Sequence, residues 1–240
     1  MKIICTRDEA SFDSTMSEIL ISQITSKKDG VIGLSTGRTT GNLHKITARV
    51  FVEKGFEVGE TTFFALDEVT GIDRENPWAC YTKLKNEMLD ALGVDDDHFL
   101  AFPTKSDDFE GECKKLTSEI EKRGGADLII LGLGENGHLG FNQPGSDFEG
   151  GACVSTMDDD LQRRIKEDCG LPESAVLGGV TLGIKDIMSA KKLILAVKGS
   201  SKAAILKQVM YGPVTNDVPA SILQTHPDCT VVVDKAAAGE

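Results

Sequence analysis

Short apolar runs recur along the chain and are separated by longer segments of mixed polarity. Near-continuous apolarity over about four to six residues is typical of strands that helices cover on both faces, as in a parallel sheet. The pattern predicts strands around residues 3–4, 31–34, 61–66, 128–131, 193–197 and 230–233.

The segments between these runs have the spacing of amphipathic helices. In the first of them, steps of four, three, one and four residues keep the apolar side chains on one helical face; these are Phe12, Met16, Ile19, Leu20 and Ile24. Further helices are expected at 40–55, 77–92, 109–123 and 201–210. Alternating strands and helices predict an α/β fold with a mainly parallel central sheet, in which ligands bind beyond the carboxyl ends of the strands.

No linker, repeat or low-complexity tract interrupts the chain, so we expect a single domain over residues 1–240. With 26 Lys and Arg against 38 Asp and Glu, the formal net charge is −12. Nucleic acids and anionic membranes need a basic face, so neither is an expected partner, and any anionic ligand needs a local positive site.

The sequence lacks a signal-peptide pattern and any stretch of about 20 apolar residues, so we expect a cytoplasmic protein. The cysteines are scattered without a CxxC pair, which predicts buried free thiols, no disulfide framework and no metal site. They are Cys5, Cys80, Cys113, Cys153, Cys169 and Cys229.

A glycine- and hydroxyl-rich segment, Gly33 to Gly41, follows the predicted strand at 31–34 and precedes a predicted helix. Small residues let backbone N–H groups converge, hydroxyls add donors, and the helix N-terminus adds partial positive charge. The segment therefore suits a phosphate group, although a plain turn with a helix cap has the same composition. It is not a P-loop, because the Gly-Lys-Ser/Thr ending is absent.

Two adjacent acids, Asp67 and Glu68, end the apolar run at 61–66. Consecutive side chains of an extended segment point to opposite sides, so one acid can face a pocket while the other anchors the loop. A carboxylate at a partly desolvated strand end can have a raised pKa and act as a general base. A solvated or helix-capping acid pair is the structural alternative.

A glycine-rich segment with one histidine, Gly132 to Gly145, follows the strand predicted at 128–131. A histidine at a strand end is well placed for proton transfer near neutral pH, although a lone histidine is more often structural. The glycine spacing and the lack of a following helix do not fit the dinucleotide-binding fingerprint.

Together these motifs resemble the glucosamine-6-phosphate deaminase/isomerase family. The resemblance is carried by Leu34-Ser35-Thr36-Gly37, by Leu66-Asp67-Glu68, by the run from Gly132 to Pro144, by Gly199-Ser200-Ser201-Lys202-Ala203 and by Leu223-Gln224-Thr225-His226-Pro227. Residues 124–128 and 179–187 look closest to the galactosamine-6-phosphate branch. The 6-phosphogluconolactonases of the same superfamily usually continue the third motif as His-Thr-Ala-Ser instead of into Phe-Asn-Gln-Pro.

The resemblance implies a modified Rossmann-like three-layer fold and an aldose–ketose isomerisation with loss of ammonia. Asp67 matches the family's general base, and His138 matches the histidine that assists ring opening. The phosphate-binding positions match Ser35, Thr36, Gly37, Arg38, Thr39 and Lys202. Proton chemistry alone implies no cofactor and no metal; the expected partner is a small-molecule sugar phosphate, and the chain could form a homo-oligomer.

This chain departs from the family pattern at two positions around the histidine. Asn136 and Gln143 stand where acids are common, so amides replace both carboxylates of the relay. An amide can orient the His138 ring by hydrogen bonding but cannot stabilise its charged form by Coulomb attraction. Arg38 replaces a small residue of the phosphate loop. A second phosphate-binding cation is expected among Arg163, Arg164 and Lys166.

The leading functional hypothesis is an amino-sugar 6-phosphate deaminase/isomerase, with galactosamine 6-phosphate preferred and glucosamine 6-phosphate next. A 6-phosphogluconolactonase-like or non-deaminating sugar-phosphate enzyme is the second hypothesis, and a catalytically weak sugar-phosphate-binding protein is the third.

Outside these motifs, we expect His44 and His98 at the surface and His226 in a structural corner. The acidic run from Asp158 to Asp160 is expected to start a helix, and residues 161–169 are expected to belong to a lid.

Overall fold

The computed structural model describes residues 1–157 and 159–239 and is an α/β fold around a seven-stranded sheet in the order β1-β10-β9-β6-β2-β3-β5. All pairings in this sheet are parallel. The strands are β1 (Lys2–Thr6), β2 (Val31–Leu34), β3 (Thr62–Ala65), β5 (Phe99–Leu100), β6 (Leu128–Gly132), β9 (Leu193–Val197) and β10 (Cys229–Asp234). The strands expected from the apolar runs are confirmed, and β5 is an additional edge strand.

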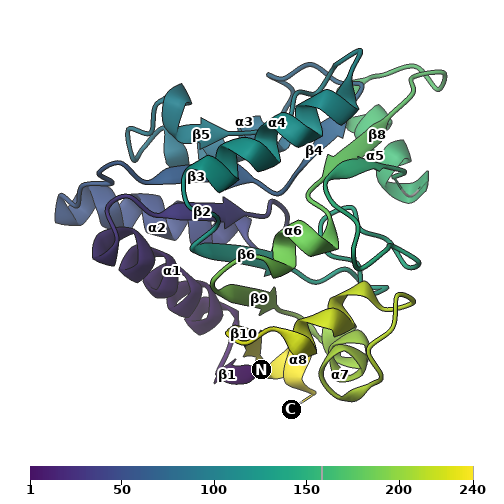
Figure 1. Ribbon diagram of the computed structural model, residues 1–240. Helices are drawn as coiled ribbons and strands as arrows, with labels where there is room; N and C mark the ends of the chain where they lie inside the picture. Colours follow the sequence, from purple (N-terminus) through teal and green to yellow (C-terminus); the bar gives the residue numbers. More distant parts are fainter. Residues whose placement is uncertain (158, 240) are drawn as a thin grey trace.

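Helices cover both faces of this sheet (Figure 1). The α-helices of the described residues are α1 (Glu9–Ser26), α2 (Gly41–Lys54), α3 (Cys80–Leu84), α4 (Phe109–Lys122), α5 (Asp159–Cys169), α6 (Ile184–Met188), α7 (Ala203–Tyr211) and α8 (Lys235–Ala238). Helix α5 packs outside the two cores of this sheet, in a cluster with Val69 of the segment that follows β3. Among the described residues, no helix is both long enough and apolar enough to cross a membrane. Within residues 1–157 and 159–239, three segments are 3₁₀-helical, at Asp96–His98, Ser200–Lys202 and Pro219–Thr225.

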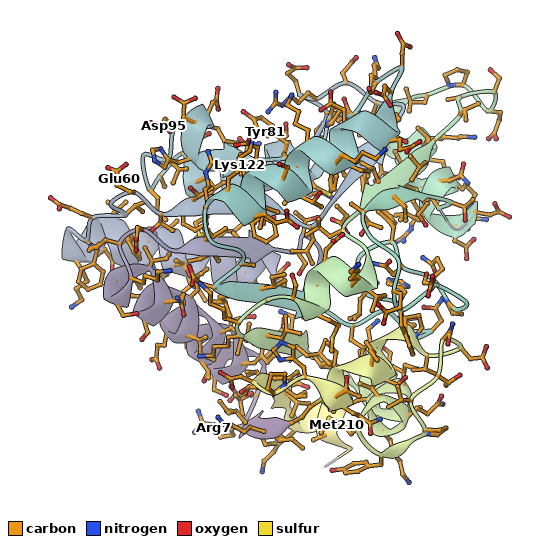
Figure 2. All side chains as sticks on the ribbon, in the orientation of Figure 1. Arg7, Glu60, Tyr81, Asp95, Lys122 and Met210 are labelled. Carbon is orange, nitrogen blue, oxygen red and sulfur yellow. The ribbon has the colours of Figure 1, made fainter. Side chains whose placement is uncertain are left out.

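Successive strand residues alternate between two hydrophobic cores. Ile32 and Leu34 of β2 pack with the apolar faces of α1 and α2, whereas Val31 packs on the other face, with residues of α4, α6 and α7. This alternation follows from the two-residue period of a strand and produces the expected three-layer fold. Charged side chains such as those of Arg7 and Glu60 lie on the outside of these layers (Figure 2).

A second sheet, three-stranded and antiparallel, is formed by β4 (Asp67–Thr70), β8 (Gly178–Thr181) and β7 (Cys153–Ser155). The expectation that Asp67 and Glu68 end the preceding strand is wrong, because they open β4. The Leu66 N–H still donates to Leu34 O of β2, and the chain then leaves the parallel sheet and pairs with β8. The acids therefore lie where the two sheets join.

The helix expected over 77–92 is shorter and changes type. It starts as α3 at Cys80, after Pro77 and the extended residue Ala79, and continues as a π-helix over Lys85–Leu89. Its start is fixed by Glu68, whose carboxylate accepts hydrogen bonds from the N–H groups of Cys80 and Tyr81.

Two expectations about burial, for His44 and for the cysteines, need correction, and the structural position expected for His226 is confirmed. His44 is fully buried, because α2 is covered by both α1 and the π-helix, and its Nδ1 lies 2.9 Å from Glu87 Oε2. Cys5 and Cys153 are exposed, because each lies on an edge strand of its sheet. His226 is buried, and its Nε2 donates to Ala190 O at 2.8 Å. Asp158 lies outside the described residues, and α5 begins at Asp159.

Candidate active site

The candidate residues follow four neighbouring strands, β9, β6, β2 and β3, whose carboxyl ends meet at one edge of the parallel sheet. The segments after these strands line one cavity of about 820 Å³. All of the site residues predicted from the sequence contribute to its lining. They are Ser35, Thr36, Gly37, Arg38, Thr39, Asp67, Asn136, His138, Gln143 and Lys202.

The loop between β2 and α2 is built to face an anion. Gly37 has φ +137°, which favours glycine, and its carbonyl accepts the N–H groups of Thr40 and Gly41 at 3.2 and 3.0 Å. Thr40, the residue before α2, makes no side-chain cap hydrogen bond, so the first N–H groups of this 14-residue helix lack a side-chain cap. The buried Ser35 hydroxyl has no hydrogen-bond partner among the described residues. The loop thus presents donors and a helix N-terminus to the cavity.

Five cationic side chains line the cavity: Lys45 of α2, Lys83 of α3 and three others that each come from a different segment. Arg38 belongs to the loop before α2, Lys202 follows β9, and Arg164 lies on α5. Burial lowers the pKa of Lys202, the nearby charge of Arg38 lowers it further, and Glu135, 3.8 Å away, raises it. This cluster supplies the local positive site that a chain of net charge −12 needs for an anionic ligand.

The structure separates the three residues considered for the further cation. Arg164 lines the cavity together with its neighbours Leu161 and Ile165 on α5. Arg163 is turned to Asp160, with Nη2 and Oδ1 2.7 Å apart, and the Lys166 ammonium donates to Glu173 O at 2.8 Å.

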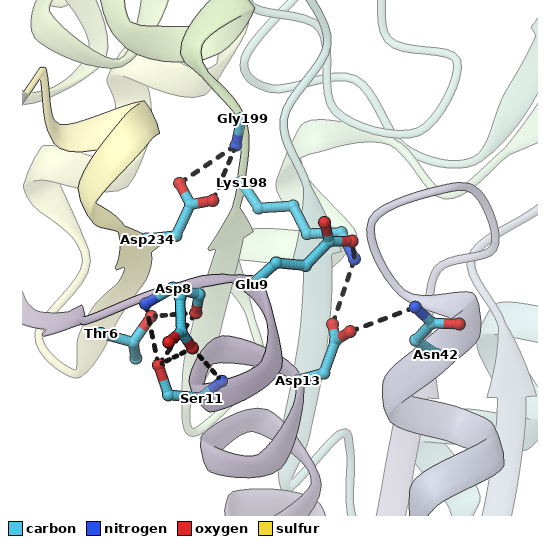
Figure 3. Close-up of polar contacts among 9 residues, drawn as sticks. All are labelled: Thr6, Asp8, Glu9, Ser11, Asp13, Asn42, Lys198, Gly199 and Asp234. Carbon is cyan, nitrogen blue, oxygen red and sulfur yellow. Dashed lines mark hydrogen bonds and ion pairs between the residues drawn. The ribbon is translucent and has the colours of Figure 1, made fainter.

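A buried ion pair joins the two segments that carry the loop and Lys202 (Figure 3). Asp13 of α1 lies 3.1 Å from the ammonium of Lys198, at the end of β9, and accepts a 3.2 Å hydrogen bond from Asn42, near the start of α2. The side chains of Asp13 and Lys198 are 5 % and 10 % exposed. One carboxylate therefore fixes the relative position of both anion-facing segments.

Asp67 and Glu68 point to opposite sides, as their adjacency in an extended segment predicts. Asp67 is half-buried and faces the cavity; burial raises its pKa to about 6, while the Cys80 thiol and the charge of Lys83 partly oppose this. Glu68 is fully buried and accepts hydrogen bonds from the N–H groups of Val69, Cys80 and Tyr81 at 2.7–2.8 Å. One acid faces the site, and the other anchors the start of α3.

The electrostatics of Glu68 combine opposing effects. Burial raises its pKa to about 7, its three backbone donors lower it, and the negative charge of Asp67 raises it again. The two neighbouring carboxyls therefore both titrate well above the usual range of such groups.

His138 is oriented by an amide relay. Asn136 Oδ1 accepts both the His138 backbone N–H at 3.2 Å and the ring Nδ1–H at 2.8 Å, so the Asn136 amide nitrogen points to Gln143 Oε1, 3.0 Å away. The ring thereby carries its proton on Nδ1. Gly134 is required here, because a Cβ at that position would lie 2.4 Å from the imidazole.

Sequence reasoning missed several cavity-lining residues of the segment 78–87, namely Trp78, Cys80, Lys83 and Glu87. The ammonium of Lys83 lies 4.3 Å from the centre of the Trp78 ring, a cation–π contact. No motif marks these residues; their only signal is the helical spacing of 80, 83 and 87, which places them on one face.

The fold and site define a member of a sugar-phosphate enzyme family. The family model described as glucosamine-6-phosphate isomerases/6-phosphogluconolactonase matches residues 9–232, and the chain belongs to this family. A glucosamine-6-phosphate deaminase of Clostridium acetobutylicum is 32 % identical over 238 residues, which are 99 % of each chain. One of Clostridium botulinum is also 32 % identical, over 100 % of this chain and 98 % of its own.

Solved structures show the same relationship. A monomeric glucosamine-6-phosphate deaminase superposes with a TM-score of 0.93 at 27 % identity and covers 100 % of this chain and 99 % of its own. The 6-phosphogluconolactonase from Trypanosoma cruzi reaches a TM-score of 0.79 at 19 % identity, over 100 % of this chain and 96 % of its own, which shows a common fold. The resemblance seen in the sequence motifs is confirmed at the level of the family.

Proposed function

We propose that the protein is an amino-sugar 6-phosphate deaminase/isomerase that forms a ketose 6-phosphate and ammonia. The observation that carries this proposal is a half-buried carboxylate, Asp67, whose pKa of about 6 suits a base, in one cavity with an oriented histidine and an anion-facing loop. The relatives at 32 % identity over nearly the whole chain support the same activity.

The substrate epimer is the finer part of the proposal. The names of the relatives support glucosamine 6-phosphate. The resemblance of residues 124–128 and 179–187 favours galactosamine 6-phosphate, its C4 epimer. We propose both as substrates, with the ratio of their kcat/KM values as the quantity to measure.

In the proposed reaction the loop and the cations hold the phosphate dianion. The loop hydroxyls and backbone N–H groups donate to its oxygens, and Arg38, Lys202 and Arg164 supply the positive charge. With its phosphate fixed, the sugar extends across the cavity toward Asp67 and His138.

Ring opening requires a proton to move from the C1 hydroxyl to the ring oxygen. His138 Nε2 accepts the proton of the C1 hydroxyl, because the proton of the neutral ring is held on Nδ1 by Asn136. The histidine then gives this proton to the ring oxygen as the bond between C1 and the ring oxygen breaks. The amide relay keeps this tautomer without adding negative charge.

Asp67 then removes the proton from C2 of the open chain and delivers it to C1. The C1 carbonyl oxygen takes up a proton and the C2 amino group loses one, so the enolamine formed between these steps becomes a C2 imine with a C1 hydroxyl group. Water adds to the imine and ammonia leaves, which gives the ketose 6-phosphate. A carboxylate with a pKa near 6 is ionised at neutral pH yet basic enough to accept the proton.

The test is to incubate the pure protein with glucosamine 6-phosphate, galactosamine 6-phosphate and 6-phosphogluconolactone. Release of ammonia and ketose in equal amounts from an amino sugar supports the proposal. Turnover of the lactone alone, or sugar-phosphate binding measured by calorimetry without turnover, would contradict it and support a lactonase or a binding protein.

Replacing Gln143 with Glu should raise kcat a few fold if ring opening limits turnover. The new carboxylate would accept the Asn136 amide proton and, through it, stabilise the positive charge that develops on His138. The control is Gln208→Glu, which adds the same charge on an exposed position of α7. An unchanged or lower rate in Gln143→Glu would show that the amide suits the substrate of this enzyme.

Replacing Lys202 with Met should raise KM and the inhibition constant of inorganic phosphate by about 10- to 100-fold, the loss expected for one charge-assisted hydrogen bond. The value of kcat should change much less. The matched control is Lys207→Met, an exposed lysine of α7 outside the cavity. A fall in kcat with unchanged phosphate affinity would contradict the assignment of Lys202 to the phosphate.

A further inference from the structure

A buried thiol lies between the anion-facing loop and the proposed base. The Thr36 hydroxyl donates to Cys80 Sγ at 3.2 Å, and the Cys80 thiol donates to Asp67 Oδ1 at 3.4 Å. Cys80 is 4 % exposed and lines the cavity. Neither the sequence motifs nor the names of the relatives assign a role to Cys80.

The position of this thiol is fixed independently of Asp67. The backbone N–H of Cys80 donates to Glu68 Oε1 at 2.7 Å, so the next carboxyl in the chain holds the start of α3 in place. The groups that act on the Asp67 carboxyl are the Cys80 thiol and the charge of Lys83, both from α3, with Glu68 beside it on β4. Among these groups, the Cys80 thiol is the one that donates a hydrogen bond directly to the Asp67 carboxylate.

We propose that Cys80 is a positioning residue that connects the phosphate loop to the base, by accepting a hydrogen bond from Thr36 and donating one to Asp67. This inference rests on the proposed function of the site.

The chemistry of a thiol suits this role. Burial and the two neighbouring carboxylates raise the pKa of Cys80, so the thiol stays protonated and remains a donor at neutral pH. A thiol is a weak donor, so it orients the carboxylate without stabilising the anion so strongly that Asp67 loses its basicity. A phosphate that binds the Thr36 hydroxyl changes the hydrogen bond from Thr36 to Cys80. Because Cys80 in turn donates to Asp67, phosphate binding thereby alters the environment of the Asp67 carboxylate.

The test compares Cys80→Ser with Cys80→Ala through the pH profile of kcat/KM. Serine is a stronger donor, so it should move the acidic limb to lower pH, whereas alanine removes the donor and should move it to higher pH, each by about half a unit or more. Shifts in opposite directions are a signature that a packing role does not produce.

The control pair is Cys113→Ser and Cys113→Ala, the same changes at a buried cysteine of α4 outside the cavity. The acidic limb should not move in either control. Loss of activity without a shift in both Cys80 variants, or a shift in the same direction, would overturn the proposal.

A second readout does not need turnover. Titration of the Asp67 carboxyl by ¹³C NMR, assigned with Asp67→Asn, should show the same opposite shifts in Cys80→Ser and Cys80→Ala. Absence of any wild-type activity would therefore contradict the proposed function and still leave the role of Cys80 measurable.

The link to the loop has its own test. Thr36→Val removes the hydroxyl but keeps the shape of the side chain. Made alone, it should shift the pKa of Asp67; made together with Cys80→Ala, it should add no further shift to that of Cys80→Ala. Additive shifts in the double variant would show that Thr36 and Cys80 act separately on Asp67 and would overturn the proposed connection.

Discussion

Replacing Asp67 with Asn should lower kcat by about 10²- to 10⁴-fold, the usual contribution of a general base, and leave the affinity for inorganic phosphate within a few fold. The amide keeps the shape of the side chain but cannot accept the C2 proton. Asp67 also lies outside the anion-facing loop, so phosphate binding does not depend on it. Steady-state rates of ketose formation and phosphate inhibition constants measure both effects.

The pH dependence gives a second expectation for the same residue. Asp67 acts as a base only when ionised, and burial raises its pKa to about 6, so wild-type kcat/KM should rise with pH through about 6 and level off above it. The residual activity of Asp67→Asn should lack this limb.

The matched control is Asp73→Asn, an exposed aspartate that pairs with Lys105 outside the cavity. It should keep both the wild-type rate and the limb. If Asp67→Asn lost phosphate affinity in the same proportion as kcat, Asp67 would be a binding residue, and the assignment as a base would be wrong.

The site could be predicted from sequence to the extent that its residues directly follow buried strands. Ser35 comes immediately after β2, and Asp67 and His138 follow β3 and β6 within a few residues. Because parallel strands end at one edge of a sheet, the apolar runs alone predict that these side chains meet. The structure brings them into one cavity.

The same reasoning failed where a residue reaches the cavity from an ordinary helix. Cys80 and Lys83 belong to a segment whose apolar positions predict a helix but not which polar side chains face a ligand. His44 was misplaced for a related reason. Its burial results from the packing of α2 against both α1 and the π-helix, and the local sequence pattern does not predict that packing.

The small sheet was missed because its strands carry little apolar signal. Strand β8 begins with two glycines, and strand β7 is largely exposed. Pairing with β4 determines these strands, and pairing is a long-range property that short windows do not contain.

Replacing Glu68 with Ala should destabilise the protein strongly, in contrast to the neighbouring Asp67. The change leaves two buried N–H groups and one partly buried N–H group without their acceptor, and each buried one costs about 1–3 kcal/mol. We expect a loss of at least about 3 kcal/mol in the free energy of unfolding, measured by urea denaturation. Glu68→Gln should lose less, because its amide oxygen still accepts.

Glu110→Ala, at an exposed position of α4, serves as the control and should change the free energy of unfolding by less than about 0.5 kcal/mol. Asp67→Asn should leave stability unchanged or higher at pH 8. The folded-state pKa of Asp67 is raised, so its ionisation weakens the folded state as the pH rises from about 4 to 6, and the amide removes that loss. If Glu68→Ala were as stable as Glu110→Ala, water would be satisfying the three N–H groups, and the start of α3 would not depend on Glu68.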